Sequence, residues 1–142
     1  MNIKHLVLFL ILSLGLTQCT QVKQQDIRHI EGYWEIESVQ SRGETFQPKG
    51  AAPSVDYYFF STDTSGIKKK LSPRMIGQYE TSEDQVAFVV REEKGAFALH
   101  FQTPLETWKE EIKEISADRL ILFHNDMEYH YKRHKKLSCN GE

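Results

Sequence analysis

Short apolar runs, separated by turn residues, recur along the chain from Ile30 to Arg133. Their spacing is close to the roughly 8–12 residues typical of antiparallel strands. Within the runs, apolar and polar residues alternate: Trp34 and Ile36 alternate with glutamates, and Phe97, Leu99 and Phe101 fall on one face. Strands do not alternate with helical patterns, so an all-β domain is predicted.

Two hairpins are predicted from their turn residues. Lys94-Gly95 separates the runs 85–92 and 96–102, and Asn125-Asp126 separates "LILFH" from "EYHYKR". A two-residue turn at Asn125-Asp126 places Leu122 opposite Tyr129 and Leu120 opposite Tyr131, leaving Ile121 and Phe123 on the other face. One face of this hairpin is then core.

Other segments are less regular. The run 107–115 fits either a helical stripe or a strand, and the short link to the next run favours a strand. Ser72-Pro73 is predicted to break the ladder between a strand at 67–71 and one at 75–81. Lys68, Lys69 and Lys70 are expected on an exposed edge or turn, where lysines discourage strand addition.

Eight or nine such strands can bury their edges by closing into an up-and-down barrel. Two stretches resemble a known family with such a barrel. The stretch "GYWEIESV" resembles the Gly-x-Trp signature of lipocalins, and "EYHYKR" is similar to the last strand of small bacterial lipocalin-like lipoproteins. The resemblance implies an antiparallel meander closing into a small lipocalin-like barrel of about eight strands over residues 30–134. It also implies that Trp34 packs under Arg133 at the closed end, with Gly32 allowing the close approach.

A barrel of this size is either filled by its own side chains or holds one small ligand. Aromatic residues expected to point inward, besides Trp34, are candidate ligand contacts because tyrosine and tryptophan combine an apolar body with a polar tip. These candidates are Tyr57, Phe59, Tyr79, Phe88, Phe97 and Tyr131. The alternative is that they form an ordinary aromatic core.

The N-terminus resembles a lipoprotein leader. A short basic start is followed by the apolar run 6–16, which has the length of a signal-peptide core and is too short to span a bilayer. "LTQC" then looks like a bacterial lipobox, so residues 1–18 are predicted as signal peptide and Cys19 as the lipidated mature N-terminus. A plain secreted protein cut near Cys19, or an uncleaved anchor, is the alternative. Thr20 favours the outer membrane by the same analogy.

Two polar segments flank the predicted domain. Residues 19–29 are polar and Gln-rich, as in a tether, and residues 135–142 form a polar tail. Cys139 lies in this tail, and without a second unmodified cysteine it is expected to be an inert thiol rather than a catalytic nucleophile.

Composition excludes several function classes. The 142 residues carry a net charge of −2 with mixed signs, so nothing indicates a nucleic-acid partner. His130 and His134 are four residues apart, about 13 Å along a strand, so they are not expected to share a metal ion, and His124 faces the other way. Phosphate-binding loops and nucleophile elbows are missing from the sequence, so neither an enzyme nor a cofactor is expected.

These features together predict a membrane-anchored lipoprotein of the cell envelope whose barrel binds a small apolar or amphipathic ligand. The alternative is a filled barrel that acts as an interaction module, docking an envelope protein through outward residues of the last hairpin such as Ile121 and Phe123.

Overall fold

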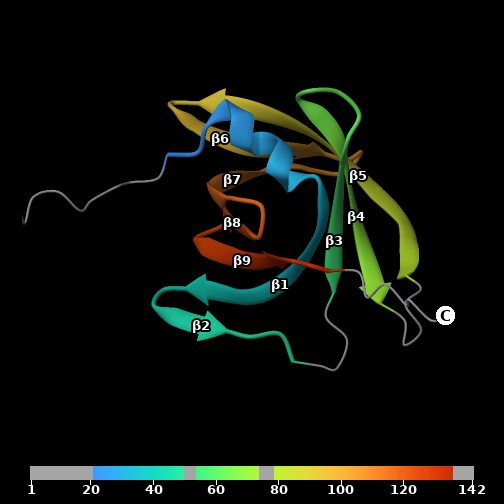
Figure 1. The fold of residues 1–142 in the computed structure, drawn as a ribbon, viewed down its shortest axis with the longest axis vertical. Coiled ribbons are helices and arrows are strands. Elements are labelled where there is room, and N and C mark those ends of the chain that lie inside the picture. The colour runs from blue at the N-terminus through green and yellow to red at the C-terminus, as the bar shows by residue number, and fades with distance from the viewer. Residues whose placement is uncertain (1–20, 50–53, 74–78, 136–142) are drawn as a thin grey trace, which may run out of the picture.

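The computed structural model describes residues 21–49, 54–73 and 79–135, with no side chains described in 72–73 and 79–84 (Figure 1). It consists of one short helix and a strand meander. The elements are η1 (Gln24–Ile30), β1 (Gly32–Ser41), β2 (Glu44–Phe46), β3 (Val55–Phe60), β4 (Ser65–Pro73), β5 (Tyr79–Glu93), β6 (Ala96–Gln102), β7 (Thr107–Ile115), β8 (Arg119–His124) and β9 (Met127–Arg133).

The sheet closes on itself. Each strand from β3 to β9 pairs antiparallel with the next, β1 pairs with β3, and β9 returns to pair with β1. The short strand β2 extends the sheet only along the second half of β1. The eight strands β1 and β3–β9 therefore form a closed antiparallel barrel, which confirms the predicted fold class.

The two predicted hairpin turns have the expected backbone. Lys94 and Gly95 have φ of 51° and 79°, and Asn125 and Asp126 have φ of 50° and 60°. Positive φ at both central residues is typical of the turns whose twist matches that of paired strands. In the second hairpin Leu122 pairs with Tyr129 and Leu120 with Tyr131, so the predicted register is confirmed.

The region around Pro73 differs from the prediction. Pro73 lies inside β4 and pairs with Tyr79, and β5 continues without interruption to Glu93. A proline is tolerated there because the pairing of β4 with β3 ends at Leu71, so Pro73 has a partner strand on one side only. Residues 75–78 of the expected separate strand lie outside the described residues.

The predicted tether is wrong in its second half. Residues 24–30 form the 3₁₀ helix η1, which begins where the Asp26 carboxylate accepts a hydrogen bond from the Lys23 backbone N–H at 3.2 Å. Ile27 and Ile30 are buried in the core, which the polar composition of the segment concealed. In the part of the chain that the structure describes, no helix is long and apolar enough to cross a membrane.

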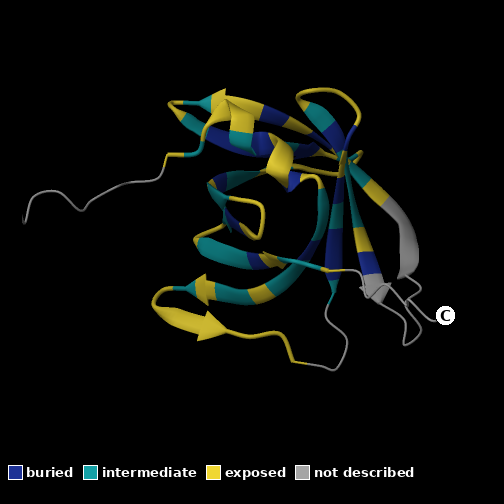
Figure 2. Ribbon diagram, in the orientation of Figure 1, coloured by how far each residue is buried: buried dark blue, intermediate teal, exposed yellow. Residues whose placement is uncertain are grey.

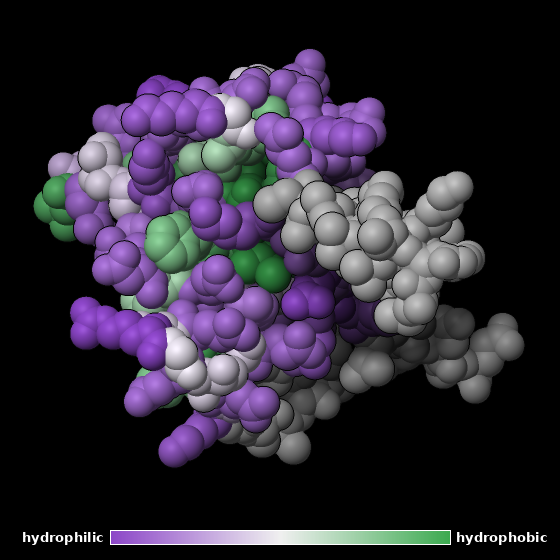
Figure 3. Space-filling model, turned by 90° about the vertical axis from the view of Figure 1, so that its left-hand side faces the viewer, coloured by the Kyte–Doolittle hydropathy of each residue, from purple (hydrophilic) through white to green (hydrophobic). Residues whose placement is uncertain are grey.

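The core lies inside the barrel and continues under η1 (Figure 2). On one side of the molecule, apolar residues are visible between the polar residues that cover most of that face (Figure 3). The apolar part of the core is aromatic and aliphatic in nearly equal measure, as expected for rings packed on pleated strands. It includes Ile30, Phe60, Phe88, Val90, Phe97, Leu99, Ile112, Leu120 and Leu122.

Candidate ligand site in the barrel

One end of the barrel is closed by a tryptophan beneath an arginine. The Arg133 guanidinium carbon lies 3.9 Å from the centre of the Trp34 ring, and the Trp34 indole N–H donates a hydrogen bond to the Ile30 carbonyl at 2.7 Å. Gly32 has φ of 120°, and a Cβ on it would lie 2.7 Å from Arg133 Nη1. The contact between Trp34 and Arg133 implied by the resemblance is therefore present, and only glycine leaves room for it.

Arg133 also joins three segments at this end. Its guanidinium donates to the carbonyls of Ala117, Glu31 and His29 at 2.7, 2.7 and 2.6 Å. Burial lowers the pKa of Arg133, which the nearby charge of Asp118 partly offsets, but an arginine side chain remains charged in a protein. The β7–β8 turn, β9 and the end of η1 are thus held together by one side chain.

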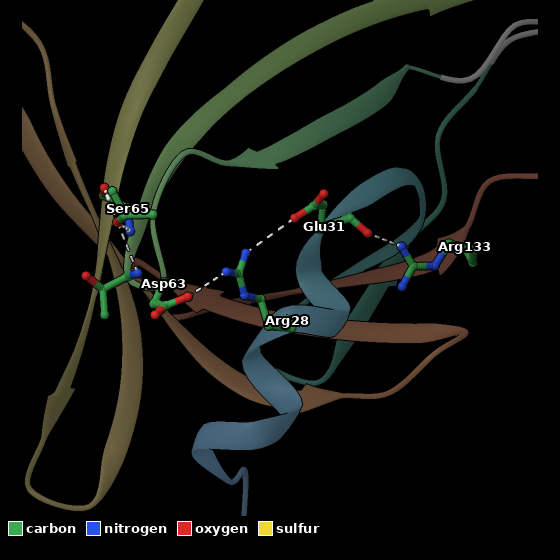
Figure 4. A network of polar contacts seen from close by, with 7 residues as sticks. Arg28, Glu31, Asp63, Ser65 and Arg133 are labelled. Carbon is green, nitrogen blue, oxygen red and sulfur yellow. Dashed lines mark hydrogen bonds and ion pairs between the residues drawn. The ribbon is translucent and has the colours of Figure 1, made fainter.

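Arg28 fastens η1 on its other side (Figure 4). It forms a 2.7 Å ion pair with Asp63 in the β3–β4 turn and a 3.6 Å ion pair with Glu31. Its guanidinium lies 5.0 Å from the centre of the Phe60 ring. The helix is therefore tied to the barrel wall on two sides, and this end is shut.

Deeper in the barrel lies a group of charged side chains. Lys68 on β4 places its Nζ 3.3 Å from Asp56 Oδ2 on β3 and 3.6 Å from Glu110 Oε2 on β7. The side chains of Lys68, Asp56 and Glu110 are 19%, 11% and 14% exposed. Strand pairing explains why they meet, because Asp56 is opposite the inward-pointing Trp34 and Lys68 is opposite the buried Tyr58.

Two tyrosines complete what we call the interior polar cluster, made up of Asp56, Tyr58, Lys68, Glu110 and Tyr131. The Tyr131 hydroxyl donates to Asp56 Oδ2 at 3.3 Å. The Tyr58 hydroxyl is buried and has no hydrogen-bond partner, and Glu110 Oε2 has none beyond its ion pair with Lys68. Because a buried polar group without a partner is costly, these two atoms are the unmet hydrogen-bonding capacity of the cluster.

The protonation states in the interior polar cluster follow from its geometry. Burial alone would lower the pKa of Lys68, but the charges of Asp56 and Glu110 outweigh it and raise that pKa, so the ammonium keeps its proton. Burial raises the pKa of Tyr58 well above its usual value, and the two carboxylates raise it further. Burial likewise raises the pKa of Tyr131. At neutral pH both phenols are therefore neutral hydrogen-bond donors.

An aromatic wall adjoins the cluster. The rings of Phe101 and Trp108 stack with centres 5.0 Å apart and planes 12° from parallel. The Trp108 indole N–H donates to Glu110 Oε1 at 3.2 Å, and Lys68 Nζ lies 5.5 Å from the centre of the Phe101 ring. Trp108 is only half-buried, so this wall combines apolar surface with a carboxylate.

The closed meander, the helix under one end and the pairing of Trp34 with Arg133 decide the architecture. It is a lipocalin-like barrel.

Comparisons with solved structures found proteins of low sequence identity. A lipocalin-like protein from Bacteroides uniformis has 9% sequence identity and a TM-score of 0.48, with 75% of this chain and 99% of that chain covered. An uncharacterized protein from Bacteroides eggerthii has 11% identity and a TM-score of 0.46, covering 73% and 98%. Neither a family profile nor a curated protein sequence matches the chain.

Of the six residues predicted as ligand contacts, three lie inside this lipocalin-like barrel and two lie on its outer face. Phe88, Phe97 and Tyr131 are buried inside, and Tyr131 belongs to the interior polar cluster. The prediction that Tyr57 and Phe59 point inward is wrong: both are on the outer face of β3, and Phe59 is 43% exposed. Their neighbours Tyr58 and Phe60 point inward instead. Tyr79 lies in β5, but its side chain is outside the described residues.

Two further expectations about surface residues are wrong. Lys68 does not lie on an exposed edge, because β4 is a central strand and Lys68 pairs with buried carboxylates. Ile121 is buried, and Phe123 is covered by Lys113, whose Nζ lies 5.0 Å from the ring centre. The last hairpin therefore does not offer the docking patch that the alternative function required.

Sequence reasoning missed Asp56, Lys68 and Glu110. The one available signal was Asp56 itself, the only polar residue in the aromatic run "VDYYFF". Lys68 and Glu110 carried no comparable signal, because each stands in a run of charged residues.

Histidines and acidic residues do not gather into a metal site in the described part of the chain. His124 Nδ1 is hydrogen-bonded to the Lys109 carbonyl at 2.8 Å, and His130 Nε2 lies 3.2 Å from Glu128. Cys19 and Cys139 lie outside the described residues.

A groove of about 510 Å³ lies on the outside of the barrel, over β5, β6 and β7. Most of its lining side chains point away from the core, as the strand alternation requires, because Phe88 and Phe101 point inward. These outward residues are Ala87, Val89, Arg91, His100, Gln102, Thr107 and Lys109. The groove is thus separate from the interior polar cluster.

Proposed function

We propose that the protein is a lipid-anchored envelope protein whose lipocalin-like barrel binds one small amphipathic molecule. The observation that carries this proposal is the interior polar cluster. Burying charged groups costs free energy even when they are paired, and an apolar core of the same volume is often more stable. A barrel that served only as a scaffold would have no need for a lysine, two carboxylates and an unpartnered phenol inside it.

The arrangement suits an amphipathic rather than a purely apolar ligand. The interior polar cluster would receive a polar end, and the adjoining Phe101 and Trp108 would contact an apolar part. Pockets of small-molecule binding proteins typically combine apolar walls with a few convergent polar groups.

Native mass spectrometry tests the binding proposal. Residues 20–142 retain η1 and every strand, and they would be produced in a bacterial periplasm and purified without detergent. A stoichiometric small-molecule adduct supports a ligand cavity. A clean apo mass after incubation with envelope lipids and alkyl amphiphiles would mean a filled barrel.

The anchor has its own test. The lipobox-like stretch "LTQC" supports acylation of Cys19, and two or three acyl chains would hold the domain stably on a membrane, since each buried methylene contributes about 0.8 kcal/mol. Metabolic labelling with a palmitate analogue should mark the protein, and Cys19→Ser should abolish the label. Unchanged labelling or membrane extraction in the variant would contradict the anchor.

The alternative function, an interaction module, would use a different docking surface from the one predicted on the last hairpin. Phe59 and Val89 are 43% and 38% exposed on the outer face of β3 and β5. The Tyr57 ring contacts that of Tyr33, with ring centres 4.7 Å apart and planes tilted by 31°. Exposed apolar residues gathered on one sheet face favour contact with another macromolecule. Should the barrel prove empty of ligand, this face is where a protein partner would be sought.

A further inference from the structure

We propose that the polar end of the ligand is an organic cation, such as a primary ammonium group, received by Glu110 and Tyr58 beside the Trp108 ring. This inference rests on the proposed ligand-binding function and specifies the chemistry of its ligand.

The charge balance of the interior polar cluster is the first argument. Asp56 and Glu110 contribute two negative charges, and Lys68 contributes one positive charge between them. Within the cluster itself one negative charge is left over, where the side chains are at most 19% exposed. Lys70 is opposite Asp56 on β4 but is exposed to solvent. A bound monocation would neutralise the negative charge of the cluster, whereas a bound carboxylate would double it.

Hydrogen-bonding capacity is the second argument. Glu110 Oε1 already accepts from Trp108, while Oε2 is buried and accepts no hydrogen bond. The Tyr58 hydroxyl, on a residue with no exposed surface, also lacks a partner and offers an acceptor oxygen. An ammonium has three donors and no acceptor, so it can serve both oxygens at once.

The aromatic rings are the third argument. Stacked Phe101 and Trp108 stand next to Glu110, and the faces of aromatic rings attract cations. The cluster already uses this preference, because Lys68 Nζ lies 5.3 Å from the centre of the Tyr58 ring and 5.5 Å from that of Phe101. A ring wall beside a carboxylate is well suited to an alkylammonium, with the alkyl chain along the rings.

The position of the Lys68 ammonium disfavours an anionic ligand, although lysine is itself a cation. Its Nζ already lies within 3.6 Å of two carboxylates that belong to the barrel itself. A fatty-acid carboxylate would have to displace one of them and would lie close to both. The ammonium of Lys68 is therefore part of the receptor's own charge balance and not a free anchor for an acid.

Three probes of equal chain length test the inference: dodecylammonium, dodecanol and dodecanoate, each below its micelle concentration. Binding to residues 20–142 at pH 7 would be measured by calorimetry and by the change in tryptophan fluorescence. The expected result is that dodecylammonium binds at least about tenfold more tightly than either of the other two, a difference of about 1.4 kcal/mol.

Variants separate the cluster from general attraction of a cation to an acidic protein. Glu110→Gln should lower the affinity for dodecylammonium at least tenfold and remove its advantage over dodecanol. Glu111→Gln makes the same change in net charge on the next residue of β7, whose side chain pairs with Lys113 at 2.7 Å, and should leave binding unchanged. Circular dichroism and urea unfolding confirm that each variant is folded.

The outcomes distinguish the inference from the proposed function. Equal binding of the three probes, tighter binding of dodecanoate, or equal effects of the two variants would overturn the cation and leave ligand binding intact. Failure of all three probes to bind would overturn both.

Discussion

Replacing Arg133 by alanine is the sharpest test of how the barrel is closed. The change removes the guanidinium that stacks on Trp34 and that donates to three backbone carbonyls. Those carbonyls belong to the β7–β8 turn and to the chain from the end of η1 into β1. Their relative positions are then left to the remaining strand pairing and to the contacts of η1.

The expected loss can be estimated from these contacts. A cation–π contact contributes about 0.5–2 kcal/mol. A hydrogen bond from a charged donor contributes about 1.5–3 kcal/mol when well buried, but Arg133 is half-exposed and water can replace it at the carbonyls, so about 0.5–1 kcal/mol each is more suitable. The free energy of unfolding should therefore fall by about 2–5 kcal/mol.

Lys132→Ala is the matched control. Lys132 is the preceding residue on β9, and its ion pair with Glu35 at 3.3 Å leaves its side chain 51% exposed, so its removal should cost less than about 1 kcal/mol. Urea unfolding of residues 20–142, followed by tryptophan fluorescence, measures both. With a slope of about 2 kcal/mol/M, the midpoint for Arg133→Ala should fall by about 1–2.5 M with little change in slope. Equal midpoints for the two variants would refute the closure argument.

Further predictions concern packing, buried charge and pH. Gly66→Ala should destabilise the protein by at least about 1–3 kcal/mol in urea unfolding, because a Cβ there would overlap the backbone carbonyl oxygen of Phe59; a smaller loss would contradict that geometry. Lys68→Met should cost about 2–4 kcal/mol at pH 7 by leaving Asp56 and its companion carboxylate without a counter-charge, and an unchanged melting temperature would show that the cluster is open to water. Burial acts to raise the pKa of Glu35, but hydrogen bonds and charges from His134 and Lys132 lower it overall. The stability lost in Glu35→Gln should therefore be fully present at pH 7, above the unfolded pKa of about 4.3, and should disappear as the pH falls through the lower folded value; a loss that is constant with pH would count against this ion pair.

Local pairing was the part of the fold that could be predicted from sequence. The β8–β9 hairpin has a two-residue turn, and once its position is known every cross-strand partner follows by counting. The closed end was also predictable, because Gly32, Trp34 and Arg133 form a recognisable combination and their contact depends on few other residues.

The inward face of β3 could not be predicted in the same way. Apart from Asp56, residues 55–60 are aromatic or apolar on both faces, so alternation does not say which set points inward, and a shift of one residue exchanges the two sets. Trp34 decides the matter through its pairing with Asp56, which places Tyr58 and Phe60 inside. That pairing joins β1 to β3 across a long loop, so the spacing of residues along the chain does not fix it.

The candidate site could not be predicted from sequence for a similar reason. Asp56, Lys68 and Glu110 come from three strands, and Lys68 and Glu110 stand in runs of charged residues, so each of these two looks like an ordinary surface residue in sequence. Because side chains alternate along a strand, one of any two consecutive charged residues in a barrel strand points inward. Which of these charges point into the barrel, and how many, therefore depends on how the strands pair when the sheet closes. Here closure brings Lys68 between Asp56 and Glu110, a combination of one positive and two negative charges that no single strand reveals.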